Sequence, residues 1–210
     1  MSEIKNNDSQ ELNRSDGDGF KQIKPEQGTT LDKAKTFIDG LFSGQKDDTV
    51  HNLESEKVYK DDHGEVYRVG DHLQPNKSFE VNGYSYRTDK VGRVVSAEGQ
   101  LRLRNPEHKR NMDTIDKVGK GDQKPGDQRG HSIGYQFEGS GGIENLSAMS
   151  KELNQGDYKA MEDKLANAIK DGHEVYLKVE PVFKGDSFRP TKYRVAYTID
   201  GEKTSVTFRN

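Results

Sequence analysis

The sequence predicts an α+β domain built on a twisted antiparallel sheet and preceded by a polar N-terminal extension. Three observations predict this fold class. Segments of alternating apolar residues flank Asn-Gly and Asp-Gly pairs, which are strong short-range signals of β-hairpins. Residues 156–171 have the 3.6-residue period of an amphipathic helix. The order of strands, long loop, helix and strands is typical of α+β proteins with an antiparallel sheet.

The N-terminal part of the 210-residue chain differs in composition from the rest. Residues 1–60 hold 9 Lys and Arg against 12 Asp and Glu, so the net charge of −3 belongs entirely to them. Their many Asn, Asp, Ser, Gln and Gly residues predict disorder. One short amphipathic helix is expected at about 30–43, where it either docks on the domain or binds a partner. We therefore predict an extension at 1–60 and a folded domain at 61–210.

The first strands of the domain are expected from about residue 65. Apolar and polar residues alternate over 78–88 around Asn82-Gly83, which predicts a hairpin. Val91–Val95 and Leu101–Leu103 are expected to form further strands, with Glu98-Gly99 as the turn between them.

The long loop expected at 105–128 carries a local excess of basic residues. From Arg102 to Arg129 the sequence has eight Lys and Arg against five Asp and Glu. Long loops in compact domains are usually functional or disordered. Arg110 and Lys120 are therefore candidate phosphate contacts. The alternative is a solvated loop, because three excess charges are few.

The best helix of the sequence, at 156–171, is expected to start with Asp157 as its N-cap and to stop at Gly172. Strands with alternating apolar residues follow it, and Asp200-Gly201 is expected to join the last two. These strands are predicted at 173–183, 192–199 and 203–208.

Composition excludes several classes of protein. The chain has no Cys, so disulfides, thiolate metal sites and cysteine nucleophiles are excluded. The sequence contains no run of about 18 apolar residues, so it predicts no membrane-spanning helix. The N-terminal residues MSEIKNNDSQ lack the apolar region of a secretory signal peptide. The protein is therefore expected either to leave its cell by another route or to be cytoplasmic.

The stretch from Asp127 to Leu146, DQRGHSIGYQFEGSGGIENL, places His131 among five glycines. The patterns of phosphate-binding and dinucleotide-binding loops and of HExxH zinc sites are absent, and the six histidines are scattered. What fits is one His as general base beside an oxygen ligand for one Mg²⁺, an ion that keeps most of its waters in proteins. The stretch and the segment after it supply such ligands in Asn145 and Asn154.

The motif DQRGHSIG, followed by ENLSAMSKELNQGDYKAMED, resembles the DNA/RNA non-specific endonucleases, also known as ββα-metal or His-Me finger nucleases. That family has an Asp-Arg-Gly-His motif, an Asn-rich segment, and Leu-Asn-x-Gly leading into a helix with a Glu. The resemblance covers roughly residues 70–210. Within the family, the sequence of this region resembles the bacterial branch that forms C-terminal nuclease modules of secreted polymorphic toxins. It implies a ββα-metal core and Mg²⁺-dependent, sequence-non-specific cleavage of DNA, and of RNA as a further substrate.

The resemblance implies a role for each matching residue. His131 matches the general base, and Asn154 matches the Mg²⁺ ligand, with Mn²⁺ as a substitute ion. Asn145 is grouped with the catalytic residues as the Asn that supports the site. Glu162 matches the helix Glu that organises metal-bound water. Arg129 matches the motif Arg, which contacts the phosphate or the transition state; the alternative is a structural ion pair.

Two further residues carry less defined expectations. Arg189, in the sequence SFRP, is a candidate phosphate contact, and the alternative is an ordinary Arg on the sheet surface. Gln128 stands where the family has the motif Asp. Either Asp127 takes over the orienting role through a local bulge, or that role is lost.

The resemblance also implies partners. A toxin nuclease is delivered into a target cell, and an immunity protein protects the producer. Two alternatives remain open at this point. One is a catalytically weak nucleic-acid-binding module whose site is impaired at Gln128. The other is a secreted nutritional or DNA-processing nuclease that is not used as a toxin.

Overall fold

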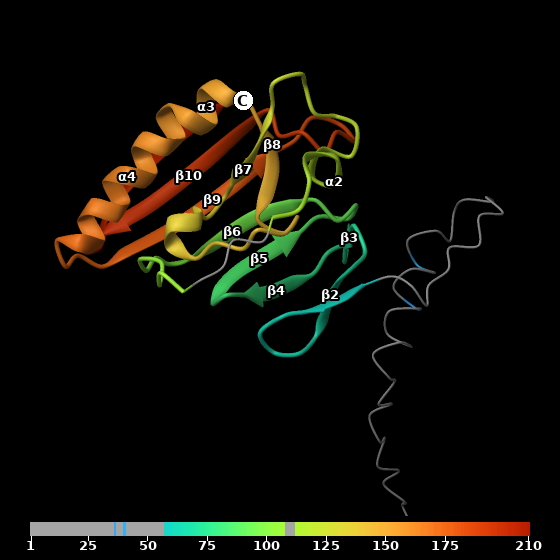
Figure 1. Ribbon diagram of the computed structural model, residues 1–210, viewed down its shortest axis with the longest axis horizontal. Coiled ribbons are helices and arrows are strands. Elements are labelled where there is room, and N and C mark those ends of the chain that lie inside the picture. The colour runs from blue at the N-terminus through green and yellow to red at the C-terminus, as the bar shows by residue number, and fades with distance from the viewer. Residues whose placement is uncertain (1–35, 37–39, 41–56, 108–111) are drawn as a thin grey trace, which may run out of the picture.

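The computed structural model describes residues 57–107 and 112–210, together with Thr36 and Gly40, which both have helical backbone (Figure 1). Most of the predicted extension at 1–60 and of its helix at 30–43 lies outside the described residues, as does Arg110. The boundary near residue 60 therefore stays a prediction.

A six-stranded antiparallel sheet forms the centre of the domain, in the order β11-β10-β9-β6-β5-β4 (Figure 1). This confirms the predicted α+β class and its antiparallel sheet. The strands are β4 (Ser78–Val81), β5 (Tyr84–Thr88), β6 (Val94–Gln100), β9 (Val175–Val182), β10 (Lys192–Ile199) and β11 (Glu202–Arg209).

Two predicted hairpin turns are confirmed. Asn82 and Gly83 join β4 to β5 with φ angles of 55° and 71°. Asp200 and Gly201 join β10 to β11 with φ angles of 49° and 87°. Two consecutive left-handed residues are what a two-residue hairpin of type I′ requires, and Asn, Asp and Gly adopt this conformation most readily.

The predicted turn at Glu98-Gly99 is wrong, because β6 runs through both residues as one strand. The chain turns earlier, where the Asp89 carbonyl accepts a hydrogen bond from the Gly92 N–H. Gly99 is needed for packing instead: a Cβ there would lie 2.8 Å from Cδ1 of the Tyr84 ring on the neighbouring strand. A Gly inside a strand often marks such a close approach.

Two smaller sheets lie beside the main one. The first, in the order β1-β2-β3, consists of β1 (Val58–Lys60), β2 (Val66–Val69) and β3 (His72–Leu73). The second is an antiparallel ribbon of β7 (Gln128–His131) and β8 (Leu146–Met149). The loop expected at 105–128 contains a short helix, α2 (Ile115–Gly119). A 3₁₀ turn, η2 (Tyr135–Phe137), follows the first strand of the ribbon.

Two helices follow the ribbon, α3 (Lys151–Gln155) and α4 (Asp157–Lys170). The predicted bounds of α4 agree closely, but its N-cap is Gly156, and the expected cap at Asp157 is wrong. Gly156 breaks the helical path with φ −104° and ψ −111°. The ribbon, α3 and α4 form a ββα unit, so the ββα core is confirmed.

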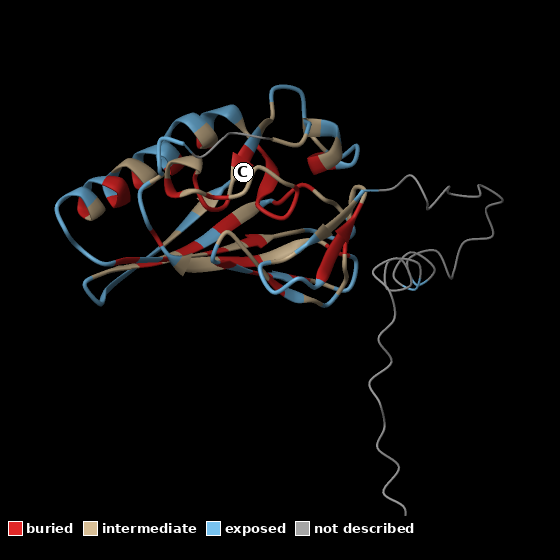
Figure 2. Ribbon diagram, turned by 60° about the horizontal axis from the view of Figure 1, so that its bottom comes forward, coloured by how far each residue is buried: buried red, intermediate tan, exposed pale blue. Residues whose placement is uncertain are grey.

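Helix α4 packs along one face of the large sheet, and the ribbon lies on the same face (Figure 2). Hydrogen bonds hold the ribbon from both sides. The Tyr158 hydroxyl of α4 donates to the Ser132 carbonyl at 2.9 Å, and Ser147 of β8 shares a 2.7 Å hydrogen bond with the Tyr193 hydroxyl of β10. The apolar face of α4 buries Tyr158, Met161, Leu165, Ala166 and Ala168.

A buried ion cluster joins the small sheet to the rest of the domain. Arg68 of β2 is 1% exposed and donates to both carboxylate oxygens of Asp113, at 2.6 and 3.2 Å. Its Nη1 also lies 3.6 Å from the buried Glu144 carboxylate. Burial raises the pKa of Glu144. Burial alone would also raise the pKa of Asp113, but the Arg68 hydrogen bonds outweigh it and lower that pKa.

In the described ranges, no helix has the length and the hydropathy that crossing a bilayer requires.

Candidate active site

One open cleft of about 420 Å³ brings together residues from β7, η2, α3 and α4. Four of the predicted site residues line it: Arg129, His131, Asn154 and Glu162. Its other lining residues are Gly134, Tyr135, Gln136, Gln155 and Lys159.

His131 is the last residue of β7, where it pairs with Leu146 of β8. Gly130 precedes it, and a Cβ there would lie 2.6 Å from both Cβ and Cε of Met149. Gly130 is therefore packed closely against a side chain of the partner strand β8. This packing fixes the strand end that carries the His131 imidazole.

Asn154 lies in α3, before the break at Gly156, and its side chain is held by β7. Its Nδ2 donates to the Gln128 side-chain oxygen at 2.8 Å, and Gln155 Nε2 donates to the same oxygen at 3.1 Å. Because α3 and α4 are separate helices, Asn154 and Glu162 line the same cleft without having to share one helix face.

Glu162 of α4 closes the opposite side of the cleft. Burial raises the pKa of its carboxyl to about 7, against the opposing effect of Lys159. Gly134 leaves the space that this carboxylate occupies, since a Cβ at Gly134 would collide with Glu162 Oε1 and lie 2.8 Å from its Cδ. The backbone of Gly134, with φ −58° and ψ 149°, suits any residue, so only space demands glycine there.

We expect Gly134→Ala to leave the fold intact and to lower the cleavage rate by about a hundredfold, the cost of a 1 Å misplacement in an active site. The added methyl group displaces the Glu162 carboxylate. The measurement is plasmid nicking by purified variants. In a Glu162→Asp background the shorter side chain leaves room, so the same methyl group should cost much less. Wild-type nicking by Gly134→Ala would contradict the role given to this contact.

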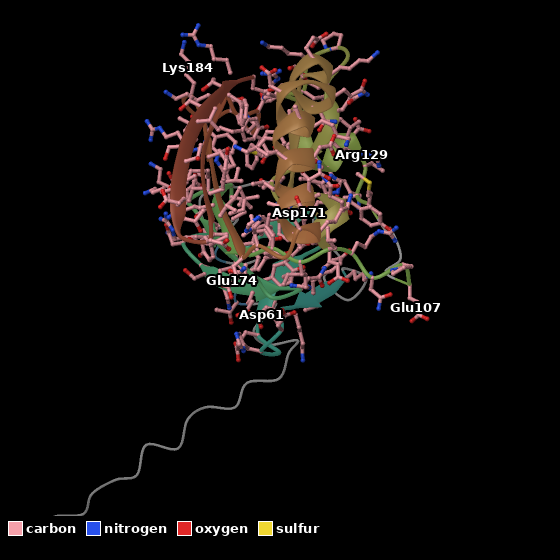
Figure 3. The ribbon with its side chains drawn as sticks, turned by 90° about the vertical axis from the view of Figure 1, so that its left-hand side faces the viewer. Asp61, Glu107, Arg129, Asp171, Glu174 and Lys184 are labelled. Atoms are coloured by element: carbon pink, nitrogen blue, oxygen red, sulfur yellow. The ribbon has the colours of Figure 1, made fainter. Side chains whose placement is uncertain are left out.

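Arg129 is exposed at the rim of the cleft, on the surface beside the helices (Figure 3). Its Nη1 donates to the backbone carbonyl of Asp113 at 3.1 Å. The partner in this hydrogen bond is a neutral carbonyl, and the exposed position of the guanidinium is compatible with a phosphate contact.

Asn145 does not reach the cleft. It is 1% exposed, and its amide is fully engaged with the backbone: Oδ1 accepts from the Ile133 N–H at 2.9 Å, and Nδ2 donates to the carbonyls of Ile133 and Ser140, both at 2.8 Å. Its grouping with the catalytic residues is corrected accordingly. These hydrogen bonds hold the loop that follows His131.

Two glycines between His131 and Asn145, Gly139 and Gly142, are required by packing. A Cβ at Gly139 would collide with the Ile133 carbonyl and lie 2.8 Å from Asn145 Nδ2. A Cβ at Gly142 would lie 2.6 Å from Cδ of the Glu144 carboxylate.

The prediction of Arg189 as a phosphate contact is wrong. Its side chain is buried in an ion pair and does not line the cleft. Its Nε and Nη2 donate to the two carboxylate oxygens of Asp127 at 2.7 and 2.9 Å. Both side chains are less than a tenth exposed. Arg189 is therefore no phosphate contact. Asp127 for its part is paired with Arg189 and does not take over the orienting role of the family's motif Asp.

The same pair predicts a pH-dependent stability. Burial alone would raise the pKa of Asp127, but hydrogen bonds from Arg189 and from the Lys124 N–H outweigh it and lower the pKa. A carboxyl with a lowered folded-state pKa stabilises the fold above its unfolded-state pKa of about 4, and the contribution disappears as the pH falls through the folded-state value.

We therefore expect Asp127→Asn to lower the free energy of unfolding by about 3 kcal/mol at pH 7, because it leaves a buried Arg without its anion. The difference from wild type should shrink as the pH falls below about 4. Urea unfolding at several pH values measures it. Asp186→Asn, in the exposed loop before Arg189, is the control and should change stability by less than about 0.5 kcal/mol. A pH-independent difference would refute the ion-pair explanation.

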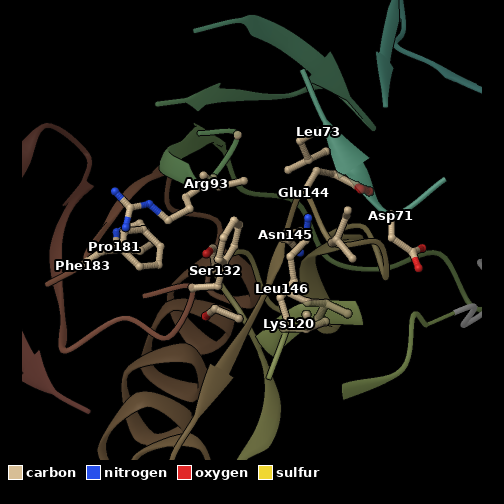
Figure 4. Close-up of a pocket in the computed structure, with 16 residues that line it drawn as sticks. Asp71, Leu73, Arg93, Lys120, Ser132, Glu144, Asn145, Leu146, Pro181 and Phe183 are labelled. Carbon is tan, nitrogen blue, oxygen red and sulfur yellow. The ribbon is translucent and has the colours of Figure 1, made fainter. Parts of the chain in front are cut away.

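Lys120 does not line the cleft, and its role as a phosphate contact stays a prediction. It lines a separate pocket of about 40 Å³ between the ribbon and the large sheet (Figure 4). Its Nζ lies 4.8 Å from the centre of the Phe188 ring and 3.3 Å from His72 Nδ1. A cation stacked on an aromatic ring supports the local packing. Arg110 lies outside the described residues.

The sequence reasoning missed Lys159, which lines the cleft and affects the ionisation of Glu162. The signal was available, because Lys159 precedes Glu162 by three residues and therefore lies on the same face of α4. Tyr135 and Gln136 were missed as well. They enter the cleft through the turn at η2, which no periodic pattern marks.

The donor set suits a hard divalent cation that keeps most of its waters. The cleft offers the amide of Asn154 and the desolvated carboxyl of Glu162, both of them oxygen donors. Within the described residues no three His, Asp or Glu side chains gather into a metal-binding group. A cage made of protein ligands alone therefore does not form here, whereas a site completed by water fits these residues.

Comparisons with known proteins show which proteins this chain is similar to. Residues 75–201 match the family model described as DNA/RNA non-specific endonuclease. The chain is also 31% identical, over 202 aligned positions, to the type VII secretion system protein EssD of Staphylococcus aureus strain USA300 and to that of strain NCTC 8325 / PS 47. The alignment covers 84% of this chain but spans only about a third of the length of these relatives, 33%.

Solved structures with a similar fold include an Sda1 nuclease with a bound zinc ion, at 17% identity and a TM-score of 0.47. That match covers 60% of this chain and 75% of the other. An extracellular endonuclease matches at 23% identity and a TM-score of 0.44, over 61% and 79% of the two chains.

Proposed function

Because the chain belongs to the DNA/RNA non-specific endonuclease family, we propose that its 61–210 part hydrolyses phosphodiester bonds of DNA, and also of RNA, without sequence preference. The supporting observation is the single cleft lined by His131, Asn154, Glu162 and Arg129. Contacts to the phosphate backbone carry no sequence information, which suits a non-specific enzyme.

Members of the family bind a divalent metal ion, and we propose Mg²⁺ for this chain, with Mn²⁺ as a substitute. Asn154 would hold the ion through its amide oxygen, and Glu162 would hold waters around it. A bound divalent ion stabilises the negative charge that builds on the phosphate during hydrolysis.

The chain's own residues perform the proton transfer and the positioning. His131 accepts a proton from a water molecule as that water attacks the phosphorus in line with the leaving 3′ oxygen. Arg129, exposed at the rim, binds the non-bridging oxygens of the phosphate through its charged donors. The raised pKa of Glu162 is that of a desolvated carboxyl, and a nearby cation favours the ionised form.

The test is cleavage of plasmid DNA and of RNA by the purified chain, with Mg²⁺ and with EDTA. We expect nicking and linearisation with Mg²⁺, loss of activity with EDTA, and recovery when Mg²⁺ is added in excess. Cleavage that persists in EDTA would contradict the metal-dependent mechanism. A salt-dependent gel shift without any cleavage would favour the alternative of a nucleic-acid-binding module.

We also propose that the protein is exported by a type VII secretion system and acts as a toxin, held in check by an immunity protein. The support is the likeness to EssD, which extends beyond the matched family segment. Co-purification with a small acidic protein that abolishes cleavage is the expected result. Unhindered growth of cells that produce the active enzyme without any partner would contradict the toxin role.

A further inference from the structure

The side chain of Gln128 in β7 contacts the side chain of Asn154 in α3. Gln128 opens β7, and its Oε1 accepts the 2.8 Å hydrogen bond from Asn154 Nδ2. Gln155 donates to the same oxygen at 3.1 Å. Two donors on two consecutive residues of α3 thus converge on one acceptor and hold that oxygen in place.

This arrangement fixes which end of the Asn154 amide faces the cleft. A side-chain amide has a donor end and an acceptor end, and only the donor end makes a favourable contact with Gln128 Oε1. With Nδ2 turned to Gln128, the Oδ1 atom is the end left for a cation. An acceptor at position 128 therefore selects the amide orientation that a metal ligand needs.

We propose that Gln128 is the positioning residue of the metal site, and that it does this as a neutral hydrogen-bond acceptor. The inference rests on the proposed function, because it takes Asn154 as the metal ligand. Asp127 is excluded from the role by its pairing with Arg189. Partners that orient metal ligands are typically worth 10–100-fold in metal affinity.

The experiment measures Mn²⁺ binding to the full chain by electron paramagnetic resonance, with no nucleic acid present. Gln128→Met keeps the length of the side chain but removes the acceptor, and we expect the Kd for Mn²⁺ to rise about 10–100-fold. Gln128→Glu keeps the acceptor, so Mn²⁺ should bind at least as tightly as to wild type. Gln100→Met makes the same substitution at an exposed position of β6 that does not line the cleft, and it is the matched control, with Mn²⁺ affinity near wild type.

A second readout separates positioning from general damage. Gln128→Met keeps the Asn154 oxygen, so its kcat on plasmid should return towards wild type at saturating metal, with the loss confined to the metal dependence. Asn154→Ala should lose both Mn²⁺ binding and kcat. If Gln128→Met fails to fold, Gln128→Glu still decides, because weaker Mn²⁺ binding by that variant overturns the proposal.

The outcomes separate the inference from the function on which it rests. Wild-type Mn²⁺ affinity in Gln128→Met, with binding lost in Asn154→Ala, overturns the positioning role alone. Wild-type Mn²⁺ affinity in Asn154→Ala overturns the ligand assignment, and the positioning role with it.

Discussion

His131→Ala is expected to lose plasmid nicking by a factor of about 10²–10⁴, the usual contribution of a general base. Among the described residues that line the cleft, His131 carries the only imidazole. Alanine cannot accept the proton of the attacking water. The loss should therefore appear in kcat, with little change in KM, because the phosphate contacts remain.

His63→Ala is a suitable control for this measurement. His63 is exposed, and its Nε2 lies 3.2 Å from the Glu80 carboxylate in an unrelated part of the domain. Its activity should stay close to wild type. A purified, folded His131→Ala variant that nicks plasmid at the wild-type rate would rule out the role of His131 as the base.

Arg68→Met is expected to lower the free energy of unfolding by about 3–5 kcal/mol, the typical cost of removing one partner from a buried ion pair. The substitution leaves the carboxylates of Asp113 and Glu144 without their cation, and Glu144 is 2% exposed. Urea unfolding at pH 7 provides the measurement. The large effect follows from desolvation, because a charge that is left buried and unpaired cannot recover its hydration.

Two further variants test that explanation. Arg87→Met replaces an exposed Arg on β5 and should change stability by less than about 0.5 kcal/mol. Glu144→Gln removes one of the stranded charges, so its combination with Arg68→Met should cost less than the sum of the two single changes. Strict additivity would show that the pair does not act through charge.

The parts of the fold that sequence predicted are those governed by local rules. Asn82-Gly83 forms a hairpin turn because these residues adopt the left-handed backbone that the turn needs. The period of α4 appears because one face must meet the sheet. Glu98-Gly99 looked like a turn for the same local reason, but the Tyr84 ring of the neighbouring strand decides its conformation.

The candidate site shows the same division. Family-like spacing indicated His131, Asn154 and Glu162, and the fold brings them to one cleft. Pairing between distant residues was not visible: Arg189 and Asp127 are 62 positions apart, and nothing local marks either as the partner of the other. The structural position of Asn145 could not be predicted either. Only in the folded loop do backbone groups form hydrogen bonds with both the oxygen and the nitrogen of its side-chain amide.

The break at Gly156 has a mechanical consequence. The short helix before the break is attached to the ribbon, whereas α4 after it packs on the large sheet. The two walls of the cleft thus lie on two packed helices that are separated in the chain by the break at Gly156. Any movement of α3 relative to α4 changes the width of the cleft. A ligand that contacts both walls therefore reduces that movement. Protection of the α3 amides from hydrogen exchange should therefore report occupancy of the cleft more sensitively than protection in α4.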